Sequence, residues 1–221
     1  MKTRILLATF ISTLICNIAP ASSKSLHNFA KETQAINSAQ AKKIDTTCTK
    51  EVAQTKPKIA HLHSHEQTYK LEITRLECET KNLQESSAST QGTLAMLEYI
   101  YAEYDKLLNK YYKLYRTEFK KQNKSTPSGI FSHEPSIQKG QDTLLDEQRA
   151  WLKLRDSYAA YLQAAHAHTY EANGGGTIWG IETANARLKF LQKRVETLFW
   201  RYNAMLADEG IGLDSVFNHE Q

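Results

Sequence analysis

Polar and charged residues occupy one side of a predicted helix, where apolar side chains are expected. Gln148, Trp151 and Arg155 are spaced at i, i+3 and i+7, so they lie on the same helical face. Trp151 and Arg155 are four residues apart, which lets the guanidinium stack on the indole ring. Burying such groups costs free energy unless each of them finds a partner. The pattern therefore predicts either a polar network inside the fold or a recognition surface.

Two arginines of the last predicted helix are candidate partners for this motif. Asp156 directly follows Arg155 and lies about 100° around the helix from it. Its carboxylate can reach a backbone amide or the side chain of Arg187 or Arg194. One interpretation is a buried polar clasp that sets the register of two helices and fixes the turn at Gly174–Gly176. The other is a Trp/Arg patch of the kind that is enriched at protein interfaces.

A histidine-rich segment is the densest candidate for metal binding. His61, His63 and His65 are followed by Glu66. On a helix only His61 and His65 share a face, whereas on an extended loop all three can converge. A zinc site needs a defined ligand set with oriented supporting groups, and the sequence offers no such partner. We therefore expect solvated or capping histidines and no metal site.

Catalytic chemistry has less support in the sequence. Glu147 and Asp156 form a possible carboxylate pair, but nine positions on one helix separate them by roughly 13 Å. Gly174–Gly176 follows a predicted helix, whereas phosphate-binding glycine loops follow a strand. No serine occupies a nucleophile elbow. The sequence thus predicts no catalytic residues, no enzymatic activity and no cofactor.

Apolar residues recur every three or four positions after residue 90, which predicts three long helices. The stripes run from Leu97 to Phe119, from Leu144 to Leu162 on a helix of about 137 to 172, and from Ile181 to Met205. Ser125–Gly129 and Asn173–Gly176 provide the breaks between these helices. We therefore expect an all-α fold with an antiparallel three-helix bundle over about 90–207.

The region from 28 to 86 is predicted to form an additional helical hairpin or layer, because its apolar positions are also helically spaced but sparser. In an exported chain, Cys48 and Cys78 would form a disulfide. If they face each other across a hairpin, the turn lies near residue 63, whereas Pro57 favours an earlier turn. Both positions remain open. Residues 86–92 are rich in Ser and predict a linker.

The N-terminus has the pattern of a secretory signal peptide over residues 1–21. Lys2 and Arg4 precede an apolar run from Ile5 to Ile18, and Ala19-Pro20-Ala21 supplies the small residues of a cleavage site. The apolar run is shorter than the roughly 20 residues that span a bilayer. We expect a periplasmic or secreted protein without a stable membrane anchor after cleavage.

Charge and length limit the possible functions further. The chain carries 28 basic and 24 acidic residues, a net charge of +4, and loss of two basic residues with the signal leaves +2. Nucleic-acid binding is not expected, because it needs a concentrated basic face. The predicted organisation is an N-terminal helical extension over 22–86, the three-helix domain over 90–207 and a flexible tail over 208–221.

The motif resembles that of the LprI-type lysozyme-inhibitor family of small secreted helical domains. In that family a Leu precedes Gln-Arg-x-Trp, then Arg-Asp, a Gly-Gly turn and a last helix that closes with Arg and Leu. The matching residues here are Leu145, Gln148, Arg149, Trp151, Arg155, Asp156, Gly175, Gly176, Arg194 and Leu198. The tyrosine-rich run from Tyr101 to Tyr112 is also similar to the family's first long helix. The resemblance covers about residues 90–200.

Several positions depart from the family pattern. Ala159 and Ala186 stand where the family usually has two cysteines, and Gly180 stands where a proline is expected. The resemblance implies a binding protein whose partner is a lysozyme-like cell-wall hydrolase. The alternative is a structural or adaptor module of the cell envelope in which the motif serves only folding. A net charge of +2 gives no long-range attraction to a basic lysozyme, so affinity would have to come from a local acidic or aromatic patch.

Overall fold

The computed structural model describes residues 26–87, 89–125, 134–172 and 178–207, and within these ranges the chain is helical and contains no strand. The elements are α1 (Leu26–Thr33), α2 (Ser38–Thr55), the short 3-10 helix η1 (Lys56–Ile59), α3 (Ser64–Ser86), α4 (Thr90–Ser125), α5 (Glu134–Ala172) and α6 (Ile178–Leu206). The prediction of an all-α fold is confirmed. The predicted signal peptide, the tail from 208 and the glycines at 174–176 lie outside the described residues.

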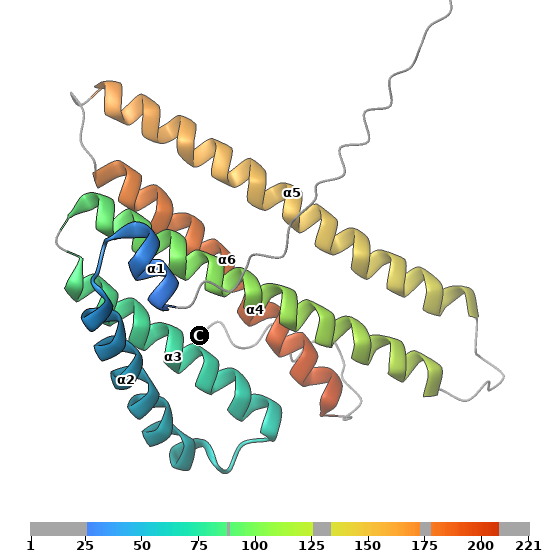
Figure 1. The fold of residues 1–221 in the computed structure, drawn as a ribbon. Helices are drawn as coiled ribbons and strands as arrows, with labels where there is room; N and C mark the ends of the chain where they lie inside the picture. The colour runs from blue at the N-terminus through green and yellow to red at the C-terminus, as the bar shows by residue number, and fades with distance from the viewer. Residues whose placement is uncertain (1–25, 88, 126–133, 173–177, 208–221) are drawn as a thin grey trace, which may run out of the picture.

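Three long helices follow one another after residue 90, and α5 runs opposite to α4 and α6 (Figure 1). The closest packing is between α4 and α6, whose apolar stripes face each other. Fully buried side chains at this junction include Met96, Ile100, Leu108 and Tyr111 of α4 and Leu191, Val195, Leu198 and Phe199 of α6. The three helices end close to the predicted breaks, because Gly, Ser and Pro interrupt the helical spacing there.

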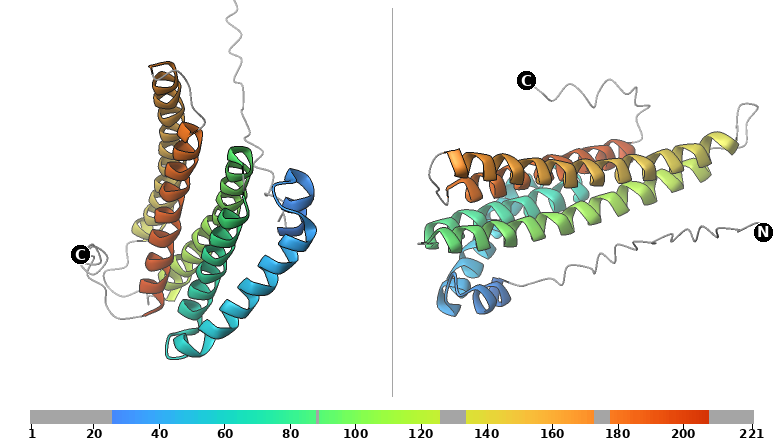
Figure 2. Two further views of the ribbon diagram at one scale, coloured as in Figure 1. Left: turned by 90° about the vertical axis from the view of Figure 1, so that its left-hand side faces the viewer. Right: turned by 90° about the horizontal axis from the view of Figure 1, so that it is seen from above.

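Helix α5 lies at one side of the molecule and packs chiefly on α6 (Figures 1 and 2). From residue 143 to its end, only Leu144 and Gln148 of α5 are buried. Three of its large apolar side chains point outward instead: Leu154 is 56% exposed, Tyr161 65% and Tyr170 51%. Helix α5 therefore packs one face against α6 and leaves apolar side chains exposed beside that face, with Leu154 and Tyr161 on one side of the helix and Tyr170 on another.

Helices α1, α2 and α3 form the predicted N-terminal layer, on the opposite side of the molecule from α5 (Figure 2). The predicted disulfide between Cys48 and Cys78 joins α2 to α3, with 5.5 Å between the Cα atoms. The sequence left two positions open for the turn between these helices, one at Pro57 and one near residue 63, and the observed turn contains both. Pro57 lies in η1, and His63 is the N-cap of α3. The turn is thus long enough to include both.

Polar contacts around one buried carboxylate attach this layer to the long helices. Glu79 of α3 is 3% exposed and accepts a hydrogen bond from the Tyr99 hydroxyl of α4 at 3.0 Å. Arg75 approaches the Glu79 carboxylate at 2.9 Å and Asp45 of α2 at 2.6 Å. Burial raises the pKa of Glu79, and Arg75 and Tyr99 offset this effect only in part. The network connects α2, α3 and α4 beside the continuous apolar core.

Within the ranges described, none of the helices combines the length and the apolar character needed to cross a bilayer.

Candidate functional site: a polar clasp and an adjacent pocket

A buried arginine of α6 is the centre of the contact between α5 and α6. Arg194 is 6% exposed, and its two terminal nitrogens donate to the two carboxylate oxygens of Glu147, each at 2.6 Å. One of these nitrogens also donates to Oε1 of Gln148 at 2.6 Å. Arg201 adds a further contact to Glu147 at 3.2 Å. We call Glu147, Gln148, Trp151, Arg194 and Arg201 the polar clasp.

The electrostatics of the clasp favour the charged form of its carboxylate. Burial alone would raise the pKa of Glu147, but the hydrogen bonds and positive charges of Arg194 and Arg201 outweigh burial and lower it. Paired, charge-assisted bonds between a guanidinium and a carboxylate are among the stronger hydrogen bonds in proteins. The clasp therefore holds an ion pair rather than a proton donor, which does not suit it to acid–base catalysis.

Trp151 is the aromatic member of the clasp and contacts charged groups from two helices. The Arg194 guanidinium lies 5.3 Å from the centre of its ring, and the Arg155 guanidinium lies 5.9 Å away. The Phe190 ring of α6 is nearly parallel to the indole at 5.8 Å. The predicted stacking of Arg155 on Trp151 is confirmed. The indole is only partly exposed, so most of its surface serves the contact between α5 and α6.

The other predicted motif residues point elsewhere. The expected contact of Asp156 with Arg187 or Arg194 is wrong. Its carboxylate instead lies 2.8 Å from Arg155, the preceding residue, and its side chain is 68% exposed. Helix α5 itself places Arg155 next to Asp156, so this pair does not depend on how α5 packs against α6. Arg149 also points outward and approaches Asp146 at 3.2 Å. Gly175 and Gly176 lie outside the described residues.

Glu147 is the clasp residue that the sequence did not predict, because in the sequence it stood out only as half of a possible carboxylate pair with Asp156. The last helix does contain a sequence pattern that predicts an acidic partner. Arg194 and Arg201 are seven residues apart and therefore lie on one face, two turns from each other. Two arginines on an apolar face require an acidic partner opposite. Glu147 directly precedes Gln148 of the motif, and it fills that role.

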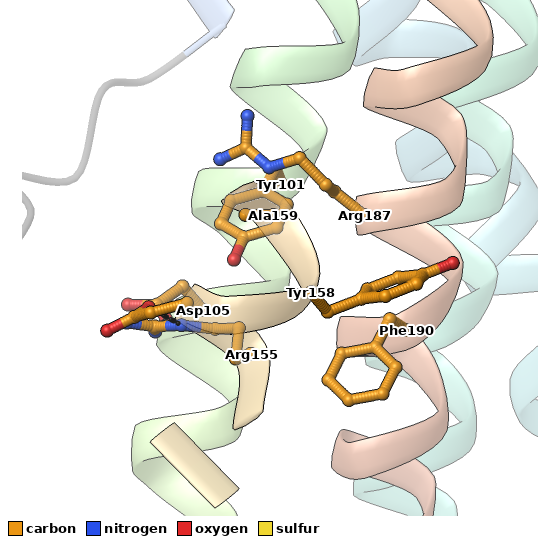
Figure 3. A pocket seen from close by; sticks show the side chains of 8 residues that line it. Tyr101, Asp105, Arg155, Tyr158, Ala159, Arg187 and Phe190 are labelled. Atoms are coloured by element: carbon orange, nitrogen blue, oxygen red, sulfur yellow. Dashed lines mark hydrogen bonds and ion pairs between the residues drawn. The ribbon is translucent and has the colours of Figure 1, made fainter. Parts of the chain in front are cut away.

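A pocket of about 270 Å³ lies beside the clasp, between α4, α5 and α6. Figure 3 shows its walls: Tyr101 and Asp105 from α4, Arg155, Tyr158 and Ala159 from α5, and Arg187 and Phe190 from α6, with Asp156 completing the lining. Burial raises the pKa of Tyr101, and the charges of Arg155 and Arg187 reduce that shift. The motif helix thus contributes one set of residues to the clasp and another to the pocket.

The histidine-rich segment has structural contacts. His63 caps α3, with its backbone N–H donating to Glu66 at 3.1 Å. The His65 ring is hydrogen-bonded to Asn203 of α6, whose amide donates to Glu66 at 3.3 Å. His61 is exposed. In the part of the chain that the structure describes, no group of three or more His, Cys, Asp or Glu residues is arranged to hold a metal ion.

Comparison with known families gives a match over most of the long-helix region. The sequence model of the family described as "Lysozyme inhibitor LprI" matches residues 80–198, which is more than half of the chain. The matched segment begins within α3 and includes most of the clasp and the whole pocket lining. Helices α1 and α2 lie outside it. No curated protein and no solved structure matches the chain.

Proposed function

Because the chain belongs to the LprI family of lysozyme inhibitors, we propose that it is an exported helical binding protein that inhibits a lysozyme-like cell-wall hydrolase. Inhibition takes place by protein–protein contact, with no chemical step of its own. The predicted signal peptide supports export to the periplasm or the medium. The arrangement of the clasp supports a purely binding role, because its charged groups are paired with one another.

The observation that carries this proposal is the outward face of α5. Residues 157–170 contain no Asp, Glu, Lys or Arg. Leu154 and Tyr161, which are seven residues apart and therefore lie on one side of the helix, are more than half exposed. Exposed apolar residues that gather on one surface mark interaction sites, and tyrosine is enriched at the centres of interfaces. Gln148, Trp151 and Arg155 of the motif are largely covered, so we assign partner contact to this neighbouring side of the same helix.

A binding surface without charges also explains how a weakly basic protein could bind a basic hydrolase. With a predicted mature charge of +2, the protein gains no long-range attraction to a basic hydrolase. Apolar burial and hydrogen bonds from tyrosine do not depend on opposite charges. Binding to such a surface is therefore expected to vary little with salt concentration.

A cell-wall lysis assay tests the proposal. Mature protein at micromolar concentration should slow the clearing of a cell-wall suspension by a panel of lysozymes. Tyr161→Asp should weaken inhibition about tenfold or more, because it places a charge within the apolar contact. Thr47→Asp, an exposed position on α2, serves as the matched control and should inhibit like the wild type.

Failure of the wild-type protein to slow lysis would contradict the inhibitor function. The structural or adaptor role would then be the better interpretation, and the internal pairing of the clasp favours it as the second candidate. In that case, variants of the α5 face should leave thermal stability unchanged, whereas variants of the clasp should lower it.

A further inference from the structure

The C-terminal half of α4 carries a concentration of positive charge that the balance of the whole chain conceals. Residues 106–125 contain seven Lys or Arg residues and a single acidic residue, whereas the whole chain contains 28 basic and 24 acidic residues. Five of the seven recur every three or four positions, so they lie along one side of the helix. We call these five residues the basic face of α4: Lys106, Lys110, Lys113, Arg116 and Lys120.

The packing of α4 turns this side of the helix towards solvent. Two positions along a helix correspond to about 200°, so Lys113 lies opposite to Tyr111, which is fully buried in the core. Lys113 and Arg116 are exposed, and Lys120 is partly exposed. Helix α4 also continues beyond the N-terminal end of α3 (Figures 1 and 2). Its last turns are therefore not covered by that helix.

The fold neutralises only part of the charge on the basic face. Its first two lysines form ion pairs, one with Glu103 of α4 and one with Glu72 of α3. The acidic residue within the segment pairs with a lysine outside the face. Lys113, Arg116 and Lys120 form no ion pair among the residues that the structure describes. Three positive charges are therefore left on the part of the face that extends past α3.

The composition of the face indicates which kind of partner it fits. Asn109 and Thr117 complete this side of α4 between 106 and 120, and both are polar and exposed. The centre of a protein interface is typically apolar and rich in aromatic residues, and this face offers neither. Attraction to anionic lipid, in contrast, needs only clustered Lys and Arg side chains. From Lys113 to Lys120 the cations extend over roughly 10 Å along the helix axis, so they can contact one surface together.

We propose that the basic face of α4 binds reversibly to the phosphate headgroups of an anionic lipid surface, with α4 lying along that surface. Lys113, Arg116 and Lys120 supply the attraction. The predicted export of the chain places it beside the lipid surfaces of the cell envelope and away from nucleic acid. The basic face is separate from the outward face of α5, so lipid binding stands or falls independently of hydrolase inhibition.

Cosedimentation of the mature protein with phospholipid vesicles tests this proposal. We expect binding to vesicles that contain phosphatidylglycerol and none to vesicles of phosphatidylcholine alone. Binding should weaken as salt is added, because the screening length falls from about 30 Å at 0.01 M to about 10 Å at 0.1 M ionic strength. Equal binding to the two kinds of vesicle, or no binding to the anionic vesicles at low salt, overturns the proposal.

A competition experiment distinguishes lipid from nucleic acid, the other common source of clustered phosphates. A DNA duplex is added to the anionic vesicles at an equal concentration of phosphate. Most of the protein should stay on the vesicles. Displacement of most of the protein would identify nucleic acid as the preferred partner and overturn the assignment to lipid.

Substitution of the three unpaired cations tests the location of the site. Each basic residue near an anionic surface contributes about fivefold to binding, the equivalent of about 1 kcal/mol. Lys113→Gln/Arg116→Gln/Lys120→Gln should therefore weaken vesicle binding about 100-fold. The melting temperature should stay close to that of the wild type, because none of the three forms an ion pair in the fold. If the triple variant does unfold, Lys113→Gln alone should weaken binding about fivefold.

A second triple variant controls for net charge. Lys50→Gln/Lys153→Gln/Lys189→Gln removes three exposed lysines from α2, α5 and α6, so it has the same net charge as the first triple variant. It should retain most of the vesicle binding. Equal losses for the two triple variants would show that attraction follows the total charge and would overturn the assignment to α4.

Discussion

At the scale of single residues, the buried guanidinium of Arg194 carries the main energetic cost of the α5–α6 contact. Removing a charge from water costs several kcal/mol, and this cost is offset only when every donor finds a good acceptor. Glu147 and Gln148 supply acceptors for the two terminal nitrogens, and Trp151 covers the flat side of the cation, whereas Nε is buried and has no hydrogen-bond partner among the described residues. The clasp therefore stabilises the protein only when it is complete.

Removing one member of the clasp should accordingly be more harmful than its number of contacts suggests. Arg194→Ala leaves Glu147 partly buried without its main partner, and we expect the free energy of unfolding to fall by about 3 to 5 kcal/mol. Arg149→Ala removes an exposed ion pair and should change it by less than about 1 kcal/mol. Urea unfolding followed by circular dichroism measures both values. Similar losses for the two variants would contradict a buried, mutually dependent clasp.

Sequence alone predicted part of this site, and the limit of prediction has a physical cause. The stacking of Arg155 on Trp151 follows from a spacing of four residues on one helix. The pairing of Glu147 with Arg194 joins residues 47 positions apart, so no local spacing reveals it. Asp156 was expected to reach a backbone amide or an arginine of α6, but it pairs with Arg155, which the same helix already places beside it.

At the scale of helices, two polar junctions hold the elements in register, and their carboxylates have opposite pKa shifts. Glu79 lies between α2, α3 and α4, and its pKa is raised chiefly by burial. Glu147 lies between α5 and α6, where two arginines lower its pKa in spite of burial. Helix limits could be predicted from apolar spacing and glycine breaks. The junctions could not, because they depend on which helices become neighbours.

The two junctions should respond oppositely to pH. The lowered pKa of Glu147 gives a stabilising contribution that is present above the unfolded value of about 4.3 and is lost as the pH falls through the folded pKa. The raised pKa of Glu79 gives a contribution that is present below that value and is lost as the pH rises through the folded pKa.

Urea unfolding between about pH 3 and pH 7 tests whether the contributions of Glu147 and Glu79 to stability change in opposite directions with pH. The stability advantage of wild type over Glu147→Gln should shrink as the pH falls. Relative to Glu79→Gln, the wild type should lose stability as the pH rises. Parallel pH profiles for the two variants would show that the assignment of the shifts is wrong.

At the scale of the whole molecule, one apolar core runs from α1 to α6. It contains Leu26 and Phe29 of α1 as well as Leu198 and Phe199 of α6, and the Phe29 and Tyr99 rings meet at 5.0 Å. The division into segments 22–86 and 90–207 stays a prediction from the sequence. Physically, we expect these segments to unfold together, because each covers apolar surface of the other.

The position of the tryptophans makes this expectation measurable. Trp151, Trp179 and Trp200 all lie on α5 and α6, whereas far-ultraviolet circular dichroism reports every helix. Thermal unfolding followed by tryptophan fluorescence and by circular dichroism should therefore give coincident transitions. An early loss of helix without a change in fluorescence would show instead that α1–α3 unfold separately.

The way in which α3 lies against α4 has an evolutionary consequence. The family match begins at residue 80, within α3, yet Tyr69, upstream of the match, packs edge-on against Tyr111 of α4 at 5.4 Å. A relative consisting only of the matched segment would expose that side of α4 to water. Acquiring or losing the preceding helices therefore requires coordinated changes from apolar to polar residues along α4. In this chain, a change on that side of α4 therefore calls for a matching change in α3.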